Sequence, residues 1–212
     1  MVFEELLSLI GREPVFESAA LLAGDVKPAY LRRQLSAWVA AGKLWQLRRG
    51  LYALAPPYQR VQPHPFLVAN RLMPGSYVSL QAALADADLI PEHVAAVTSV
   101  SPRRPGAWST PLGEFLYRHV RPDLLFGYEL RPVGEGQAAL VAKPEKALLD
   151  LIYLQPEADV AGYIASLRLQ NLDRLDFGTL EALAGRFGKP KMRRAAKAVA
   201  LEAERAGFFE PL

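Results

Sequence analysis

Apolar residues recur at helical spacing in the first quarter of the chain, between Pro28 and Gly42. The recurring positions are Leu31, Leu35, Trp38 and Val39, which stand at i, i+4, i+7 and i+8. That spacing gathers them on one face of a helix. Pro28 suits the first helical position, where its missing N–H would have no partner, and Gly42 can end a helix in a left-handed conformation. The pattern predicts an amphipathic helix.

Shorter patterns on both sides of this helix complete a small unit. Residues 44–47 and 51–54 have the composition of two strands, joined by Arg48-Arg49-Gly50, in which Gly50 supplies the turn. Residues 2–10 and 17–23 are short helical patterns, closed by Gly11 and by Gly24-Asp25. Three helices followed by a hairpin predict a winged helix-turn-helix.

The outward side of the main helix carries side chains that suit DNA. The candidate groove residues are Lys27, Tyr30, Arg32, Arg33, Gln34 and Ser36. Arginine and glutamine can each make two hydrogen bonds to a base edge in the major groove. Arg48 and Arg49, at the predicted hairpin tip, are candidate contacts to phosphates or a minor groove. The alternative is a solvated basic helix packed on a hairpin in some other small domain.

A second domain is predicted after Ala55-Pro56-Pro57, because two prolines favour an extended linker. The domains are therefore residues 1–56, the DNA-binding unit, and residues 57–212. Helical patterns occupy 62–71, 76–89, 144–154, 159–169, 179–187 and 190–205, and strand patterns occupy 94–100, 114–120, 125–130 and 138–141. Strands in the middle with helices gathered after them indicate an α+β fold.

Composition narrows the class of protein. The chain has 212 residues, 51% of them hydrophobic and 22% charged, which is typical of a globular protein with a sizeable core. The net charge is only +3, but the pI is 9.2, and basic residues cluster at 32–49, at 103–104 and at 189–197. Local basic clusters favour contact with nucleic acid.

Several other classes are disfavoured. The chain has no cysteine, and its three histidines, His64, His93 and His119, are far apart, so neither a metal site nor a cofactor is expected. No apolar run is long enough for a membrane span, and the N-terminus lacks the features of a signal peptide, which favours a cytoplasmic location. Without a long heptad repeat or an exposed apolar stripe, a monomer is slightly favoured off DNA.

The last helical pattern carries a possible second basic surface, made of Lys189, Lys191, Arg193, Arg194 and Lys197. Three of these residues recur at i, i+3 and i+6. The row is either an ordinary solvated helix face, a phosphate-contacting surface that clamps DNA beside the winged unit, or a face that meets a protein. The pattern alone leaves these three readings open.

An enzyme is not expected. Glu145 and Asp150 lie on one predicted helix, but five residues turn it by about 500°, so their side chains point in different directions. We interpret this helix as a charged start followed by a core face. No glycine loop suited to a phosphate occurs, and no serine has the surroundings of a nucleophile elbow.

Four stretches, taken in order, resemble the AbiEi-type antitoxin and transcriptional-regulator family of abortive-infection toxin–antitoxin systems. They are Leu44–Leu54, Tyr77–Leu84 with Leu89-Ile90-Pro91, Thr110–His119 and Lys143–Leu151. The resemblance implies a DNA-binding N-terminal domain and a C-terminal antitoxin domain. It also implies repression of the protein's own operon through repeats upstream of the gene, and action against a nucleotidyltransferase-like toxin. A stand-alone winged-helix regulator, whose second domain binds a ligand or a protein without any toxin, would have the same sequence features.

Overall fold

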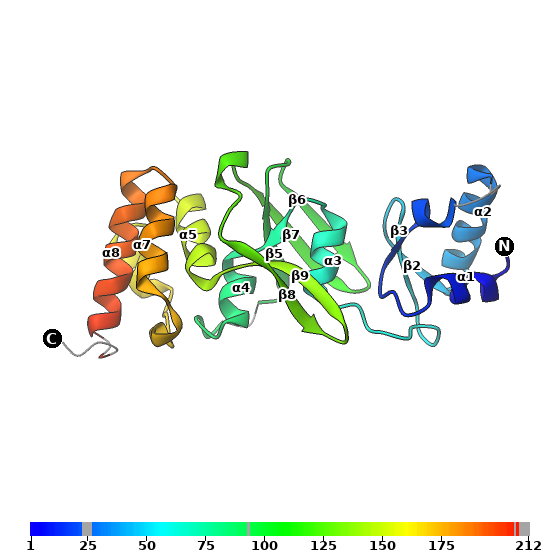
Figure 1. Cartoon of the computed structure of the whole chain (residues 1–212), viewed down its shortest axis with the longest axis horizontal. Coiled ribbons are helices and arrows are strands. Elements are labelled where there is room, and N and C mark those ends of the chain that lie inside the picture. The colour runs from blue at the N-terminus through cyan, green and yellow to red at the C-terminus, as the bar shows by residue number, and fades with distance from the viewer. Residues whose placement is uncertain (23–26, 93, 206, 208–212) are drawn as a thin grey trace.

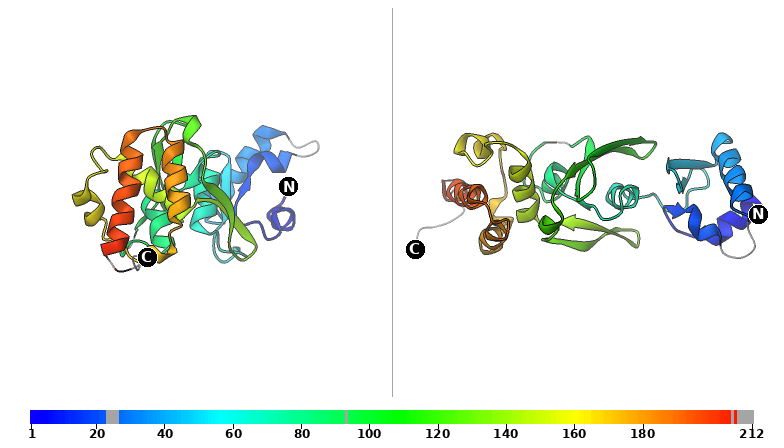
Figure 2. Two further views of the ribbon diagram at one scale, coloured as in Figure 1. Left: turned by 60° about the vertical axis from the view of Figure 1, so that its left-hand side comes forward. Right: turned by 90° about the horizontal axis from the view of Figure 1, so that it is seen from above.

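The fold is an elongated α+β arrangement, as predicted. The computed structural model describes residues 1–22, 27–92, 94–205 and 207. The N-terminal elements lie at one end of the molecule, a sheet lies in the middle, and a group of helices lies at the other end (Figures 1 and 2). In the described residues no helix combines the length and apolar character needed to cross a membrane.

The N-terminal unit is built from two helices and a three-stranded sheet. Its elements are α1 (Phe3–Ile10), β1 (Phe16–Glu17), a 3-10 helix η1 (Ser18–Leu22), α2 (Pro28–Ala40), β2 (Leu44–Arg48) and β3 (Leu51–Leu54). The strands are antiparallel in the order β1-β3-β2. The main predicted helix and the predicted hairpin are therefore present.

One predicted element of this unit differs from the structure. A short helix was expected over 17–23; a 3-10 helix spans Ser18–Leu22, but Glu17 belongs to a strand, in which Phe16 and Glu17 pair with Tyr52 and Leu51. The backbone of these two residues bonds a distant strand, which prevents an α-helix from starting there. Residues 23–26, including the predicted Gly24-Asp25 stop, lie outside the described residues, so the winged helix-turn-helix stays an interpretation.

The central sheet has six strands in the order β6-β7-β5-β4-β9-β8. They are β4 (Tyr77–Val78), β5 (Ala96–Ser101), β6 (Gly106–Thr110), β7 (Gly113–His119), β8 (Tyr128–Gly134) and β9 (Gln137–Ala142). The pairs β5–β7 and β4–β9 are parallel, and the other pairs are antiparallel. Two of these strands, β4 and β6, were not predicted, and the strand expected over 125–130 is β8, three residues later.

The missed strand β4 explains why a predicted helix is shorter than expected. A helix was expected over 76–89, but Tyr77 and Val78 pair with β5, and Val78 also pairs with β9. Helix α4 (Leu80–Asp86) begins only after them, and α3 (Pro65–Leu72) precedes them. Alanine and leucine favour a helix locally, but two apolar residues between two strands complete the sheet instead.

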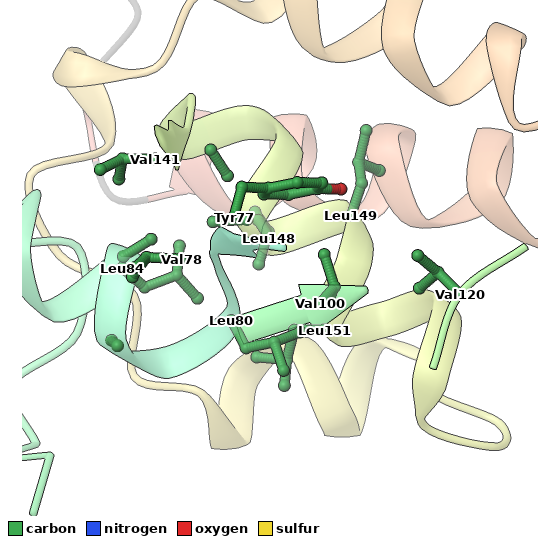
Figure 3. Packing of buried hydrophobic residues seen from close by; sticks show 14 of the residues in the cluster. Tyr77, Val78, Leu80, Leu84, Val100, Val120, Val141, Leu148, Leu149 and Leu151 are labelled. Carbon is green, nitrogen blue, oxygen red and sulfur yellow. The ribbon is translucent and has the colours of Figure 1, made fainter. Parts of the chain in front are cut away.

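Four helices gather at the far end from the N-terminus: α5 (Pro144–Leu154), α6 (Ala161–Ser166), α7 (Phe177–Arg186) and α8 (Pro190–Arg205). Two 3-10 turns, η2 (Pro122–Leu124) and η3 (Leu172–Arg174), lie between elements. Helix α5 packs on the sheet, and the Tyr77 ring lies beside Leu148 with its hydroxyl toward Leu149 (Figure 3). The main core is therefore formed between β4, its neighbouring strands and α5.

The apolar core is divided unevenly between the two predicted domains. A small cluster holds α1 to α2 and β2 together, and it includes Leu6, Leu31 and Leu35. A much larger cluster fills the rest of the molecule, and it also takes in Leu47 and Leu51 of the hairpin. Apolar contacts therefore cross the predicted boundary at residues 56 and 57, which itself stays a prediction.

Candidate nucleic-acid interface

Helix α2 turns one face inward and presents Arg33 on the opposite face. Leu31 and Leu35 are 1% and 0% exposed, so they define the buried side. Arg33 is two residues from each of them, which is about 200° around the helix. Its side chain is exposed and has no hydrogen-bond or ion-pair partner among the described residues. Arg33 is therefore free to reach a ligand in front of α2.

The other predicted groove residues near Arg33 differ in their exposure and in their hydrogen bonds. Lys27, at the N-cap, and Ser36 are exposed, and Tyr30 is 52% exposed. Arg32 is also exposed, although its Nε donates to the Pro28 carbonyl over 3.2 Å. That bond leaves the terminal guanidinium nitrogens available.

Gln34 requires a correction. Its amide nitrogen donates to the Met1 carbonyl and, over 3.1 Å, to the Tyr30 hydroxyl. Its carbonyl oxygen is buried without a partner. Because the start of the chain covers this side of α2, Gln34 is held inside the unit and does not present its amide to a base edge.

The hairpin tip is also different from the prediction. Strand β2 extends through Arg48, so the turn consists of Arg49 and Gly50, and Gly50 has a φ of +83°. The pairing of β2 with β3 shifts in register between Gln46 and Arg48, which indicates a β-bulge. A bulge bends the strand and changes the direction of the Arg48 side chain. Arg49 is exposed at the turn, and its contact with DNA stays a prediction.

Arg48 is engaged within the protein. Its Nε and one Nη donate to the Arg71 carbonyl over 3.3 and 3.2 Å, and the guanidinium pairs with Glu17 at 3.2 Å. Its side chain is only 26% exposed. Arg48 therefore links the N-terminal unit to α3, and we correct its assignment as a phosphate contact.

Three residues of the predicted second basic surface also have partners within the protein. Lys191 donates to the Gln155 carbonyl, Arg194 pairs with Asp159 at 2.7 Å, and Lys189 lies 4.7 Å from the centre of the Tyr153 ring. Four of the five side chains, those of Lys189, Arg193, Arg194 and Lys197, are exposed. Arg193 and Lys197 line a hollow of about 600 Å³ along α7 and α8. The sheet lies between α8 and α2, so this basic surface is at the opposite end of the molecule from the N-terminal unit (Figures 1 and 2).

A buried polar network was missed by the sequence analysis. Lys146 and Asp150 of α5 form an ion pair, and both side chains are 0% exposed. Asp150 also accepts from Ser79 at 2.8 Å and from Tyr77 at 3.0 Å, and the Lys146 ammonium donates to the Tyr77 hydroxyl at 2.7 Å. The signal in the sequence was the spacing of four between Lys146 and Asp150, which places them on one helix face.

Burial governs the ionisation of this network. It raises the pKa of Asp150 and of Tyr77 and lowers the pKa of Lys146, while the Lys146–Asp150 attraction opposes the shifts of both partners. The rings of Phe126 and Phe187 cover the ammonium, each about 4.9 Å away. These charged atoms do not meet solvent, so the network is structural in this conformation.

Helix α5 has the expected charged start followed by a core face, but two of the charged side chains at its start, Glu145 and Lys146, are buried. Glu145 is 5% exposed and accepts a hydrogen bond from the Asp176 backbone N–H over 2.9 Å, which ties α5 to the start of α7.

The histidines have structural contacts. His64 caps α3 by accepting from the Phe66 N–H, and His119 contacts the Arg103 carbonyl. His93 lies outside the described residues. Within the described ranges, no three histidine or carboxylate side chains meet as metal ligands would.

Comparison with known proteins gives a likeness of fold alone. No protein-family model matches the sequence, and no curated protein matches it. The chain is similar in structure to the RV2827C protein from Mycobacterium tuberculosis, with a TM-score of 0.51 and 16% sequence identity. The match covers 93% of this chain and 75% of that one. The α+β fold described above is therefore similar to that of a solved structure.

Proposed function

We propose that the protein binds double-stranded DNA through the exposed face of α2 and represses transcription from its own operon. The observation that carries this proposal is Arg33, a free guanidinium opposite the buried face of an exposed helix. Lys27, Arg32 and Ser36 flank it on the same helix, and Arg49 lies at the turn of the following hairpin. A helix with such side chains fits the major groove, where arginine reads guanine through two hydrogen bonds.

A gel-shift titration tests this proposal. The protein would be titrated onto the DNA directly upstream of its own gene and onto scrambled DNA, at two salt concentrations. We expect tighter binding to the upstream DNA, and binding that weakens steeply with salt because counterions are released from the phosphates. Equal affinity for scrambled DNA would contradict sequence-specific repression.

Arg33→Ala is expected to weaken binding to the preferred DNA by about 1–3 kcal/mol and to reduce discrimination between sequences. The reason is the loss of a side chain that contacts a base edge. Arg205→Ala is the matched control, because Arg205 lies in the last turn of α8 at the opposite end of the molecule. If Arg33→Ala discriminated between DNA sequences as well as the wild type does, α2 would not be the helix that contacts the bases.

The variants Arg49→Ala and Arg48→Ala are expected to differ in how their DNA affinity depends on salt, because we assign Arg49 to DNA contact and Arg48 to contacts within the protein. Removing the exposed Arg49 should lower affinity for all sequences and reduce the salt slope by about one unit. Removing Arg48 should leave that slope unchanged, because its guanidinium is bonded to Arg71 and Glu17. If Arg48→Ala reduced the salt slope and Arg49→Ala did not, Arg48 rather than Arg49 would be the phosphate contact.

We further propose antitoxin activity for the rest of the chain, against a nucleotidyltransferase-like toxin. This half rests on the resemblance of the stretches around Tyr77 and Lys146 to AbiEi-type proteins. Co-expression with a neighbouring nucleotidyltransferase gene should restore growth. Continued arrest, with both proteins produced, would favour the alternative of a stand-alone regulator whose second part binds a ligand.

A further inference from the structure

A cleft of about 1090 Å³ opens beside strands β5, β6 and β7, between the first turn of α4 and the last turn of α5. Its lining includes Leu80, Thr98, Leu116, Arg118, Leu151 and Leu154. Most of these side chains are apolar, and the volume slightly exceeds the range of about 300–1,000 Å³ that small-molecule sites occupy. The cleft has no part in the DNA contacts proposed above.

Two side chains of β7, those of Leu116 and Arg118, line the cleft. Leu116 is 40% exposed, which is unusual for a leucine inside a sheet. Arg118 is two residues further along the strand and therefore on the same face. Its side chain is exposed and forms no hydrogen bond or ion pair within the part of the chain that the structure describes.

The charges of the cleft are separated along its length. Arg118 pairs in register with Val100, and the cleft-lining Ala96 is four residues back along the same strand, about 13 Å away. Glu92 lines the cleft four residues before Ala96. One end therefore offers a guanidinium, the middle is apolar, and the carboxylate lies at the other end.

The wall of the cleft at α4 is held in a strained conformation. Leu80 has a φ of +59°, which is unfavourable for a residue with a side chain. Thr98 holds this segment, since its hydroxyl donates to the Ser79 carbonyl at 2.8 Å and accepts from the Ala82 N–H at 3.0 Å. The Ser79 hydroxyl is itself bonded to buried Asp150. Strain that is fixed from several sides is common at ligand sites.

We propose that this cleft binds a small organic anion with an apolar body. The anionic group pairs with Arg118, and the body covers Leu80, Leu116 and Leu154. Arginine is suited to this role because its planar guanidinium can bond both oxygens of a carboxylate or sulfonate. The site is independent of α2, so its test and the DNA-binding test can fail separately.

The test is a fluorescence titration of the full chain with anilinonaphthalene sulfonate, an aromatic anion that brightens in apolar surroundings. We expect one saturable site, and an affinity that falls about tenfold or more in Arg118→Gln and in Leu116→Gln. Glu92→Gln should not weaken binding, because the anion lies at the other end. Lys197→Gln serves as a control, because the hollow beside α8 also combines a cation with apolar side chains.

A second readout locates the probe without relying on any variant. The backbone amide resonances of Gly106 and Ala96, both lining residues, should shift with the same saturation curve. Displacement by octanoate or by naphthoate then distinguishes an aliphatic from an aromatic natural ligand. The proposal is overturned by the absence of saturable binding, by loss of affinity in Lys197→Gln instead of Arg118→Gln, or by a failure of both acids to displace the probe.

Discussion

Asp150→Ala is expected to lower the free energy of unfolding by about 3–5 kcal/mol, the usual cost of breaking a buried ion pair. The substitution leaves the Lys146 ammonium at 0% exposure without its counter-charge, and it removes an acceptor from Tyr77 and Ser79. Urea unfolding followed by circular dichroism measures the change.

Two comparisons make this prediction specific. Asp123→Ala breaks the exposed Arg121–Asp123 pair and is expected to change stability little, because solvent already screens those charges. The double variant Lys146→Met with Asp150→Leu should recover most of the loss, because it removes both buried charges together. If Asp150→Ala lowered the free energy of unfolding no more than Asp123→Ala, the buried ion pair would contribute no more to stability than the exposed one.

Leu35→Ala is expected to destabilise the N-terminal unit by about 2–5 kcal/mol. Leu35 is 0% exposed and belongs to the small cluster that holds α1, α2 and the hairpin together. Because that cluster is small, the unit should unfold at a lower temperature than the sheet, and DNA binding should be lost with it. Thermal melts and gel shifts at matched temperatures measure both effects.

Leu9→Ala is the matched control, since Leu9 of α1 is 67% exposed. A substitution on the surface usually changes stability by less than about 0.5 kcal/mol. If both variants unfold like the wild type, α2 is not held by this cluster. If Leu35→Ala unfolds the whole molecule in one transition, the N-terminal unit and the sheet are a single cooperative unit.

Local patterns in the sequence predicted the elements that local physics controls. The spacing of Leu31 and Leu35, with Pro28 and Gly42 at the ends, predicted α2 almost to the residue. The same spacing placed Arg33 on the outer face, because the direction of a side chain on a helix follows from its position in the sequence. The hairpin after α2 was predicted for a similar reason, since Gly50 marks the turn.

Elements that depend on distant partners were missed. Strand β4 has only two residues, which pair with β5 and β9, and β6 is a strand because it pairs with β7. Glu17 was wrongly assigned to a helix, because the residue with which it pairs, Leu51, is far along the chain. Propensity within a few residues cannot report a hydrogen bond to another strand.

The sequence by itself determined the α+β class, the amphipathic character of α2 and the outward position of Arg33, since all three depend on composition or on helical spacing. Only the tertiary structure decided which basic residues are free. Arg48 bonds a carbonyl 23 positions away, and Tyr77 meets Asp150 across 73 positions. Burial and pairing at such separations depend on how the elements pack. For that reason the buried Lys146–Asp150 pair and the cleft beside Arg118 become visible only in the folded chain.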